Sequence, residues 1–314
     1  MLQYKRAFGR DIVHRWEGNP LIATVDLNFK CLDIRNAGVT FYKNEMILLV
    51  TIQHLSGCQS IHLAKETKNN RFIVSKESFL SPSSESKYKI HESMGVLDPR
   101  ITKINDIYYI MYLAEGVHGI RLGLAKTKNL RNVERIGLIS EPDTKAGALF
   151  PKKFKNKFAR LERPAEGSGI WISYSEDLIY WGDSQLLFTP RGRYWDSSRI
   201  GIGPPPIEID QGWLLIYYGA KDTSAGPLYR LGTAIIDKEN PMKIIGRCNI
   251  PVLSPREIYE RIGDTPNILF STGAVMQEDN TLVIYYGAAD SCINIGTADV
   301  NDIIENCMDD ERVF

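Results

Sequence analysis

A carboxylate, a proline and an arginine stand together at residues 95–100 (Gly-Val-Leu-Asp-Pro-Arg), just before an apolar, β-prone run. The proline fixes its own φ angle and pushes Asp98 toward an extended backbone. Arg100 can orient a neighbouring carboxylate or ligand through charge-assisted hydrogen bonds. The segment therefore predicts a catalytic carboxylate, Asp98, held at the mouth of a strand. The alternative is an ordinary turn, because Asp-Pro is common in turns.

The overall composition excludes several classes of protein. The chain has 314 residues, of which 43% are hydrophobic and 24% charged, so it is globular rather than disordered. Lys and Arg together number 38, as do Asp and Glu, so the balance indicates neither a nucleic acid nor a membrane surface as partner. No apolar run approaches the roughly twenty residues that a membrane helix needs.

The cysteines and histidines lack the spacing of a metal site. The five cysteines are scattered and form no CxxC pair: Cys31, Cys58, Cys248, Cys292 and Cys307. The five histidines show no ligand spacing either: His14, His54, His62, His91 and His118. This pattern favours reduced thiols in a cytoplasmic protein and predicts no metal and no cofactor. The charged N-terminal residues lack the apolar core of a secretory signal peptide.

One β-pattern returns five times after a lead-in at residues 1–35. Each unit has a short β-run, a turn, a stronger β-run and a third β-run. The first runs are residues 37–41, 99–104, 149–154, 205–209 and 273–276. Units that recur at roughly fifty to seventy residues are typical of propeller blades. The sequence therefore predicts an all-β, five-bladed β-propeller with short terminal extensions, forming one catalytic domain over residues 1–314. The alternative is a β-sandwich or two β-domains.

The first strand of each blade lines the central channel of a propeller, and one mouth of that channel is the usual ligand site. The Asp98 segment opens the first strand of the second unit. Equivalent positions in the other units hold polar and small residues, at 36–38, 145–147, 203–205 and 271–273. This ring predicts a ligand site at the channel mouth. Helix content is expected to be small, with short helices at residues 255–263 and 300–307.

The sequence resembles glycoside hydrolase family 130, the β-mannoside phosphorylases and β-mannosidases, in ten segments that follow the family's order. The matching segments are residues 19–22, 36–38, 95–100, 149–152, 163–164, 171–175, 200–206, 212–217, 229–232 and 285–290. The resemblance implies a five-bladed propeller that acts on a small β-mannoside oligosaccharide with inversion. It also implies a single catalytic acid at Asp98, which protonates the glycosidic oxygen through a hydroxyl of the bound mannose.

The resemblance also implies a set of substrate-binding residues. The set comprises Asn36, Arg100, Lys145, Arg163, Arg199, Tyr218, Tyr286 and Asp290. Asn36 and Asp290 fall where the family holds the mannose ring. Tyr217, Tyr286 and Trp195 are candidates for walls on which a sugar stacks, although an aromatic residue on an inner strand is as often part of the core.

Several departures from the family pattern affect the expected reaction. The family has Glu at Leu97, and it has basic phosphate-binding residues where this chain has Thr51, Glu162 and Tyr218. A phosphate dianion needs several charge-assisted donors, and a carboxylate beside it costs affinity. An inverting hydrolase instead needs a base to activate water. The substitutions therefore favour hydrolysis, with Asp98 as acid and Glu162 as base. Glu208 is a weaker candidate for the base.

Other interpretations stay open. In a β-mannoside phosphorylase, Lys145, Arg163 and Arg199 would hold inorganic phosphate as co-substrate, and mannose 1-phosphate would be released. A propeller that binds a mannoside without turnover would also fit the lost site residues. Glu162 would then be a salt-bridge partner of Arg163 or Lys145. A homo-oligomer is neither indicated nor excluded, and no nucleic acid or membrane partner is expected.

Overall fold

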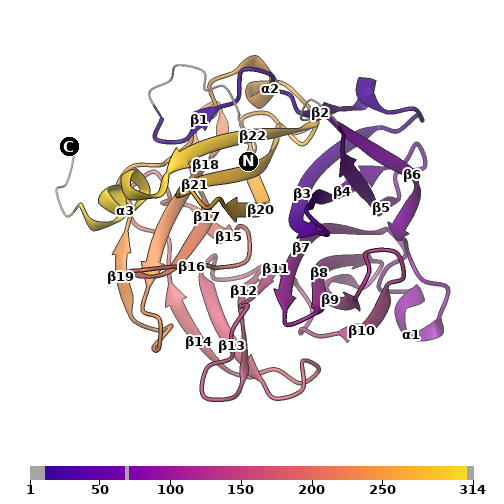
Figure 1. Cartoon of the computed structure of the whole chain (residues 1–314), viewed down its shortest axis with the longest axis horizontal. Coiled ribbons are helices and arrows are strands. Elements are labelled where there is room, and N and C mark those ends of the chain that lie inside the picture. The colour runs from indigo at the N-terminus through magenta and orange to yellow at the C-terminus, as the bar shows by residue number, and fades with distance from the viewer. Residues whose placement is uncertain (1–10, 68–70, 310–314) are drawn as a thin grey trace.

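The computed structural model describes residues 11–67 and 71–309, and β-strands make up most of the regular secondary structure in these ranges (Figure 1). The predicted all-β class is confirmed. Within these ranges the helical elements are short: η1 (Thr24–Asp26), α1 (Ser86–Lys89), α2 (Ile258–Arg261) and α3 (Val300–Met308). Both predicted helices are present, as α2 and α3, whereas α1 was not predicted. None of the helices in the described ranges is long and apolar enough to cross a membrane.

Five groups of antiparallel strands follow one another along the chain. The first comprises β3 (Asp33–Tyr42), β4 (Glu45–Gln53), β5 (Gln59–Glu66) and β6 (Phe72–Leu80). The second comprises β7 (Gly95–Ile104), β8 (Ile107–Gly116), β9 (Gly119–Thr127) and β10 (Glu134–Leu138). The third comprises β11 (Thr144–Leu149), β12 (Phe158–Pro164), β13 (Ile170–Ser175) and β14 (Gly182–Phe188). A single parallel bridge between Gln59 and Gly95 joins the first two groups into one sheet.

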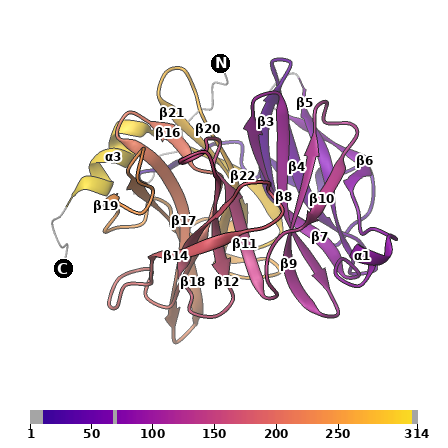
Figure 2. The same cartoon turned by 90° about the horizontal axis from the view of Figure 1, so that it is seen from below.

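The last two groups complete the series. In the fourth, β15 (Arg199–Ile202) and β16 (Ile207–Ile209) both pair with β17 (Gly212–Thr223), which is followed by β18 (Gly226–Ile236) and β19 (Ile244–Arg247). The fifth comprises β20 (Leu269–Met276), β21 (Thr281–Ala288) and β22 (Cys292–Asp299). Figure 2 shows α3 at one edge of the molecule, and it packs against β18, β19 and β22.

The segment before the first group belongs to the last group. β1 (His14–Arg15) and β2 (Ile22–Ala23) both pair antiparallel with β22 (Figure 1). The sequence predicted only a lead-in there, because strands of two residues leave no detectable alternation. Their pairing covers the backbone hydrogen-bonding groups of β22, which would otherwise be a free sheet edge.

In three units the first strand begins four residues before the predicted run, as β3, β7 and β20 show, and in the other two units the bounds differ further. The first run of the third unit was expected at residues 149–154, but β11 ends at Leu149 and β12 begins at Phe158. Between them, Phe154 and Lys157 make only an isolated bridge. In the fourth unit, three consecutive prolines at 204–206 separate β15 from β16. The third unit likewise has a proline, Pro151, between its two strands. Proline lacks the N–H that strand pairing needs, so it interrupts the strand in both units.

The apolar core lies between neighbouring groups, because both faces of a strand such as β4 are buried. Leu48 and Val50 pack in a cluster with Tyr285 of the fifth group, whereas Ile47 and Leu49 pack with the second group. Successive side chains of a strand point to opposite faces, so a strand buried on both sides is a continuous apolar run. The run from residue 46 to 50 shows this pattern.

The first strands of the groups meet in the middle of the molecule (Figure 1). β20 contacts β3, β3 contacts β7, β7 contacts β11, and β11 contacts β15. A Cβ atom at Gly38 would lie 2.6 Å from the carbonyl oxygen of Pro99, and one at Gly273 would lie 2.3 Å from that of Ala37. Glycine at these positions therefore lets the backbones of β3, β7 and β20 approach one another closely.

Candidate active site

Four of the first strands carry an irregularity at corresponding places. The strand register shifts at Asn36 in β3, at Asp98 and Pro99 in β7, at Lys145 in β11 and at Thr272 in β20. An extra residue at a β-bulge re-aims its side chain out of the regular alternation. Asp98 was predicted at the start of its strand, but it is the fourth residue of β7. Residues 95–97 already pair with β8 before the bulge begins.

Asp98 is held by two neighbours from the first group. Asn36 Nδ2 donates a hydrogen bond of 2.6 Å to Asp98 Oδ1, and the Asp98 amide donates to Thr51 Oγ1 at 3.0 Å. Asp98 and Asn36 both have positive φ angles, 55° and 49°. Such backbone conformations are uncommon for residues other than glycine and concentrate at functional sites. The Asn36 contact occupies one carboxylate oxygen and leaves Oδ2 of Asp98 to a ligand.

A cavity of about 350 Å³ lies beside Asp98. Its charged lining residues are Arg35, Asp98, Glu115, Lys145 and Asp290. Its apolar and aromatic lining residues include Leu97, Leu113, Ile120, Tyr218, Tyr229 and Phe270. Polar groups that converge on a concave, partly apolar surface are typical of a small-molecule site. Asn36 completes the polar side, so the predicted residues Asn36, Asp98, Lys145, Tyr218 and Asp290 are brought together here.

Buried polar atoms at this cavity lack partners. Within the described ranges, neither Arg35 Nε nor Asn36 Oδ1 has a hydrogen-bond partner, although both atoms are inaccessible to solvent. An unpaired buried polar group costs about 1–3 kcal/mol, so each such group needs an explanation. Both residues line the cavity beside Asp98. Asn36 Oδ1 needs a donor such as a sugar hydroxyl, whereas Arg35 Nε needs an acceptor such as a hydroxyl or phosphate oxygen.

Asp290 lies in the turn between β21 and β22, with a φ angle of 53°. Burial raises the pKa of its carboxyl, and the nearby negative charge of Asp98 acts in the same direction. A hydrogen bond from Thr265 and the positive charge of Arg35 oppose this shift. Asp98 and Asp290 therefore share one electrostatic environment, which Arg35 partly neutralises.

Arg100, a predicted substrate-binding residue, is not among the residues that line the cavity. The residue is 2% exposed, and its guanidinium donates to the carbonyl oxygens of Gly203 (2.7 Å), Ile202 (3.0 Å) and Asp98 (3.1 Å). Burial lowers the pKa of this guanidinium to about 10, which still leaves it protonated at neutral pH. Arg100 thus ties β7 to β15 and positions the backbone of Asp98.

Glu162 is also absent from the residues that line the cavity. Its carboxylate accepts hydrogen bonds from Arg160 Nη2 at 2.6 Å, from Arg160 Nε at 2.9 Å and from Ser184 Oγ at 3.2 Å. Both members of the ion pair are buried. The structure therefore favours the salt-bridge interpretation over a catalytic base, with Arg160 in place of the partners that were expected. Glu208, the weaker candidate, is exposed and lies within 3.8 Å of Lys238.

The remaining predicted cations are engaged elsewhere. Arg163 is buried, and its Nε donates to the carbonyl oxygen of Ile200 at 3.3 Å. Arg199 donates to the Tyr229 hydroxyl at 2.8 Å and forms an ion pair with Asp222. Neither arginine lines the cavity, although Arg199 supports Tyr229, which does.

The aromatic residues divide into wall and core. Tyr218 lines the cavity, where its ring lies 5.3 Å from that of Phe270 and 5.6 Å from that of Tyr229, centroid to centroid. Tyr286, another predicted sugar-stacking residue, is fully buried, and its hydroxyl donates to Glu260 at 3.0 Å, so it lies in the core and not on the cavity wall. The other two candidates also belong to the core, where Tyr217 and Trp195 stack on each other.

Arg35 and Glu115 were not predicted as site residues. Arg35 pairs directly with Thr51 in the β3–β4 register, so its side chain lies on the same sheet face as Thr51. The sequence offered one sign of it, because Arg35 directly precedes Asn36. Glu115 lies near the end of β8, opposite Gly95. No cluster of His, Cys, Asp and Glu suited to a metal ion occurs in the described part of the chain.

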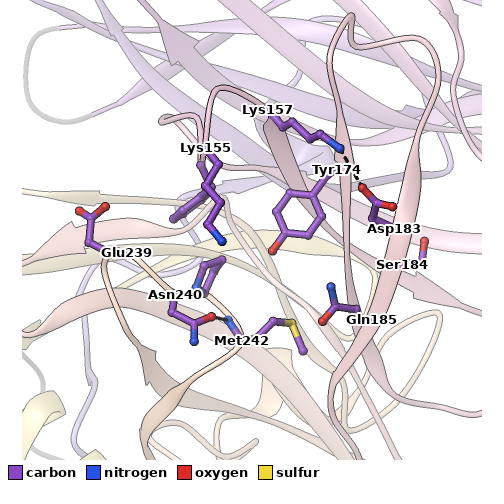
Figure 3. Close-up of a pocket in the computed structure, with 11 residues that line it drawn as sticks. Lys155, Lys157, Tyr174, Asp183, Ser184, Gln185, Glu239, Asn240 and Met242 are labelled. Atoms are coloured by element: carbon purple, nitrogen blue, oxygen red, sulfur yellow. Dashed lines mark hydrogen bonds and ion pairs between the residues drawn. The ribbon is translucent and has the colours of Figure 1, made fainter.

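A larger cavity, of about 840 Å³, lies between the third and fourth groups (Figure 3). It is lined by Lys155, Lys157, Tyr174, Asp183, Gln185 and Asn240, among others. Lys157 forms an ion pair with Asp183 at 2.9 Å. We call it the outer cavity and call the one beside Asp98 the inner cavity.

Comparison with known proteins gives a consistent result. The sequence model of glycoside hydrolase family 130, described as β-1,4-mannooligosaccharide phosphorylase, matches residues 4–309. A 1,2-β-oligomannan phosphorylase of Thermoanaerobacter sp. (strain X514) is 40% identical over 215 residues, covering 68% of this chain and 71% of that protein. A β-1,4-mannooligosaccharide phosphorylase of Ruminococcus albus is 28% identical over 313 residues, covering 96% of this chain and 93% of that protein.

A solved structure agrees with these sequence matches. The β-1,2-mannobiose phosphorylase of Listeria innocua, in complex with β-1,2-mannobiose, is similar with a TM-score of 0.85 and 27% sequence identity. The similarity covers 94% of this chain and 99% of that one. Fold and site therefore define a carbohydrate-active enzyme. The chain belongs to glycoside hydrolase family 130, as the resemblance implied, and it is a glycosidase or a β-mannoside phosphorylase.

Proposed function

We propose that this enzyme is an inverting β-mannoside phosphorylase that releases mannose 1-phosphate from a small β-mannoside oligosaccharide. The observation that carries the proposal is the meeting of Asp98 with two cations, Arg35 and Lys145, in the inner cavity. A phosphate dianion needs several charge-assisted donors, and these two side chains supply them beside the acid.

Arg35 can replace the basic phosphate-binding residue that the family has at the position of Thr51. Arg35 is the register partner of Thr51 on the neighbouring strand, so a guanidinium occupies the same part of the sheet from β3 instead of β4. Arg35 lines the inner cavity, so its positive charge faces a bound anion, and its Nη2 donates a hydrogen bond to Gln53 Oε1 that holds the guanidinium. The case for hydrolysis rested on Glu162 as base, and that carboxylate is bound to Arg160 outside the cavity. The named relatives are also phosphorylases.

The proposed reaction transfers the mannosyl group to phosphate. Asp98 gives its proton, through a hydroxyl of the mannose, to the glycosidic oxygen as the bond from that oxygen to the anomeric carbon breaks. An oxygen of phosphate attacks the anomeric carbon from the opposite face, so a β-linkage yields α-mannose 1-phosphate. Asp98 recovers a proton from the dihydrogen form of phosphate or from solvent. Asn36 holds Asp98 Oδ1, which assigns the transferred proton to Oδ2.

We also propose that the five strand groups are the blades of a five-bladed β-propeller within one catalytic domain. Support comes from the first strands, which neighbour one another in the middle of the molecule, and from the N-terminal strands that pair with the last group. Closing a propeller with strands from both ends of the chain protects its sheet edges.

A product assay tests the proposed reaction. The enzyme is incubated with β-1,2- and β-1,4-linked mannobiose, with and without inorganic phosphate, and the products are separated. We expect mannose 1-phosphate and free mannose in equal amounts, formed only when phosphate is present. Two free mannose molecules in both conditions would instead establish a hydrolase. Absence of any product, together with binding of mannobiose, would favour the binding-only interpretation.

A further inference from the structure

We propose that Glu115, positioned by Gln59, binds the hydroxyls of the sugar on the leaving side of the scissile bond and so determines which sugar is accepted there. The inference rests on the proposed function, because it assigns a second sugar position to the inner cavity. Glu115 lines that cavity, and none of the sequence motifs pointed to it.

The strand register places Glu115 one sugar away from Asp98. Glu115 is the partner of Gly95, and Leu113 is the partner of Leu97. Asp98 lies three residues beyond Gly95 along β7, which corresponds to roughly 10 Å of strand. That length leaves room for a sugar ring between the acid and Glu115.

The wall between the two carboxylates is apolar. Leu97, Leu113 and Ile120 line it together with Glu115, since cross-strand partners and alternate residues share a sheet face. A pyranose ring has C–H groups on its faces and hydroxyls around its edge. An apolar wall with a carboxylate at one end therefore matches a sugar that packs its face on the wall and donates two hydroxyls to Glu115.

Gln59 fixes the direction of this carboxylate. Its Nε2 donates to Glu115 Oε2 at 3.1 Å, and the residue itself is only 8% exposed. Gln59 Oε1 has no partner in the described part of the chain, so the bond to Glu115 is what orients the amide. A Cβ atom at Gly95, where φ is 153°, would lie 2.7 Å from Gln59 Cβ. Glycine at this position therefore allows Gln59 to reach Glu115.

The charge of Glu115 is free for a ligand. Glu162 and Glu92 are each bound by a buried or half-buried arginine, at 2.6 and 2.8 Å. Within the described ranges, Glu115 makes no comparable salt bridge, and Gln59 contacts only one of its oxygens. Oε1 of Glu115 is therefore available to accept hydroxyl hydrogens, and a carboxylate accepts such bonds more strongly than a neutral oxygen does.

The synthetic direction separates the two sugar positions, because mannose 1-phosphate and the acceptor sugar are varied independently. With mannose as acceptor, we expect Glu115→Gln to raise the KM for the acceptor about tenfold to a hundredfold, the usual effect of losing hydrogen bonds to a charged group. The KM for mannose 1-phosphate and the kcat should change less than threefold. Gln59→Leu should raise the acceptor KM by a smaller factor. Glu239→Gln, in the outer cavity, is the matched control and should change nothing.

Two outcomes would overturn the inference. Unchanged kinetics in both Glu115→Gln and Gln59→Leu would show that this wall does not bind a sugar. A fall in kcat with an unchanged acceptor KM would show that Glu115 acts on the reacting atoms instead. The melting temperature of each variant shows whether it is folded. If Glu115→Gln does not fold, the acceptor KM of Gln59→Leu tests the role of Glu115.

A binding measurement keeps this inference separate from the proposed function. Mannobiose and mannose are titrated calorimetrically into the Asp98→Asn variant and into the Asp98→Asn/Glu115→Gln double variant. This measurement requires no turnover. We expect Glu115→Gln to weaken mannobiose binding about tenfold or more. Equal affinities for mannobiose would reject the role of Glu115 even where phosphorolysis is established. Weaker mannobiose binding in an enzyme that releases only free mannose would retain Glu115 and reject the phosphorylase.

Discussion

The smaller inner cavity has the stronger features of a ligand site, and the larger outer cavity has the weaker ones. The outer cavity has more than twice the volume, about 840 against 350 Å³, but its charged lining residues are mostly exposed and Lys157 is already paired with Asp183. The inner cavity is flanked by buried polar atoms of Arg35 and Asn36 that have no partner among the residues the structure describes. The convergence of such groups with Asp98, rather than volume, distinguishes the inner cavity as the candidate site.

The difference follows from how each cavity is built. Bulges in first strands from three groups aim Asn36, Asp98 and Lys145 at the inner cavity. The outer cavity is lined largely by the loop at residues 239–242 and by side chains of the third group that point to solvent. Side chains in a loop keep their hydration, so nothing forces them to converge on a ligand.

Replacing the acid tests the comparison most severely. Asp98→Asn should lower kcat about 10²- to 10⁴-fold, the usual contribution of a general acid, because an amide cannot release the proton. The melting temperature should remain within a few degrees, since Asn36 can still donate to the new amide oxygen. Asp183→Asn in the outer cavity is the control and should keep full activity. Equal losses in the two variants would reject the distinction between the cavities.

The two cavities each contain an exposed lysine, which allows a matched pair of substitutions. Lys145→Met should raise the KM for phosphate about tenfold to a hundredfold, because a charge-assisted donor to the anion is lost. Lys155→Met should leave that KM unchanged. Initial rates measured over a range of phosphate concentrations give both values. An unaltered KM in Lys145→Met would indicate that Arg35 alone holds the anion, or that phosphate does not bind.

Asp290 should show opposite effects on activity and stability. Its pKa is raised in the folded enzyme, chiefly by burial, so the ionised carboxylate lowers the free energy of unfolding at neutral pH. This cost disappears as the pH falls through the raised pKa, where the folded state binds a proton. Asp290→Asn should therefore raise the melting temperature at pH 7, with a gain that shrinks under acidic conditions.

The same substitution should lower kcat/KM about tenfold, because a charged acceptor for sugar hydroxyls is lost. Melting curves at pH 7 and pH 4, together with kinetics at pH 7, measure both effects. A loss of stability at pH 7 would contradict the cited pKa shift. Unchanged kinetics would remove Asp290 from the binding residues.

Glu162 should affect stability far more than activity. Glu162→Gln leaves the buried guanidinium of Arg160 without a charge partner, and breaking such a pair costs about 3–5 kcal/mol of unfolding free energy. The kcat/KM, measured well below the melting temperature, should fall less than threefold. A large loss of activity that added azide restores would instead identify Glu162 as a base. Denaturant titration of the single variant and of Arg160→Met/Glu162→Met separates the ion pair from its packing.

The predicted residues that meet at the inner cavity follow local patterns. Asp98, Asn36 and Lys145 were recognised because the repeat places them at corresponding positions, and the strand bulges occur at those positions. The predicted residues that lie outside this cavity have other partners. Arg100 and Glu162 have the residue types of a sugar or phosphate site, but their contacts lie with backbone carbonyls and with Arg160.

The sequence by itself determined the all-β class, the family and the position of the proposed acid, because alternation, turn residues and short motifs are encoded within a few residues of one another. Only the tertiary structure decided which charges reach the cavity. The register of β3 and β4 places Arg35 beside Thr51. The register of β7 and β8 places Glu115 opposite Gly95. Register and the approach of separate strand groups depend on contacts between distant segments, so no local pattern can specify them.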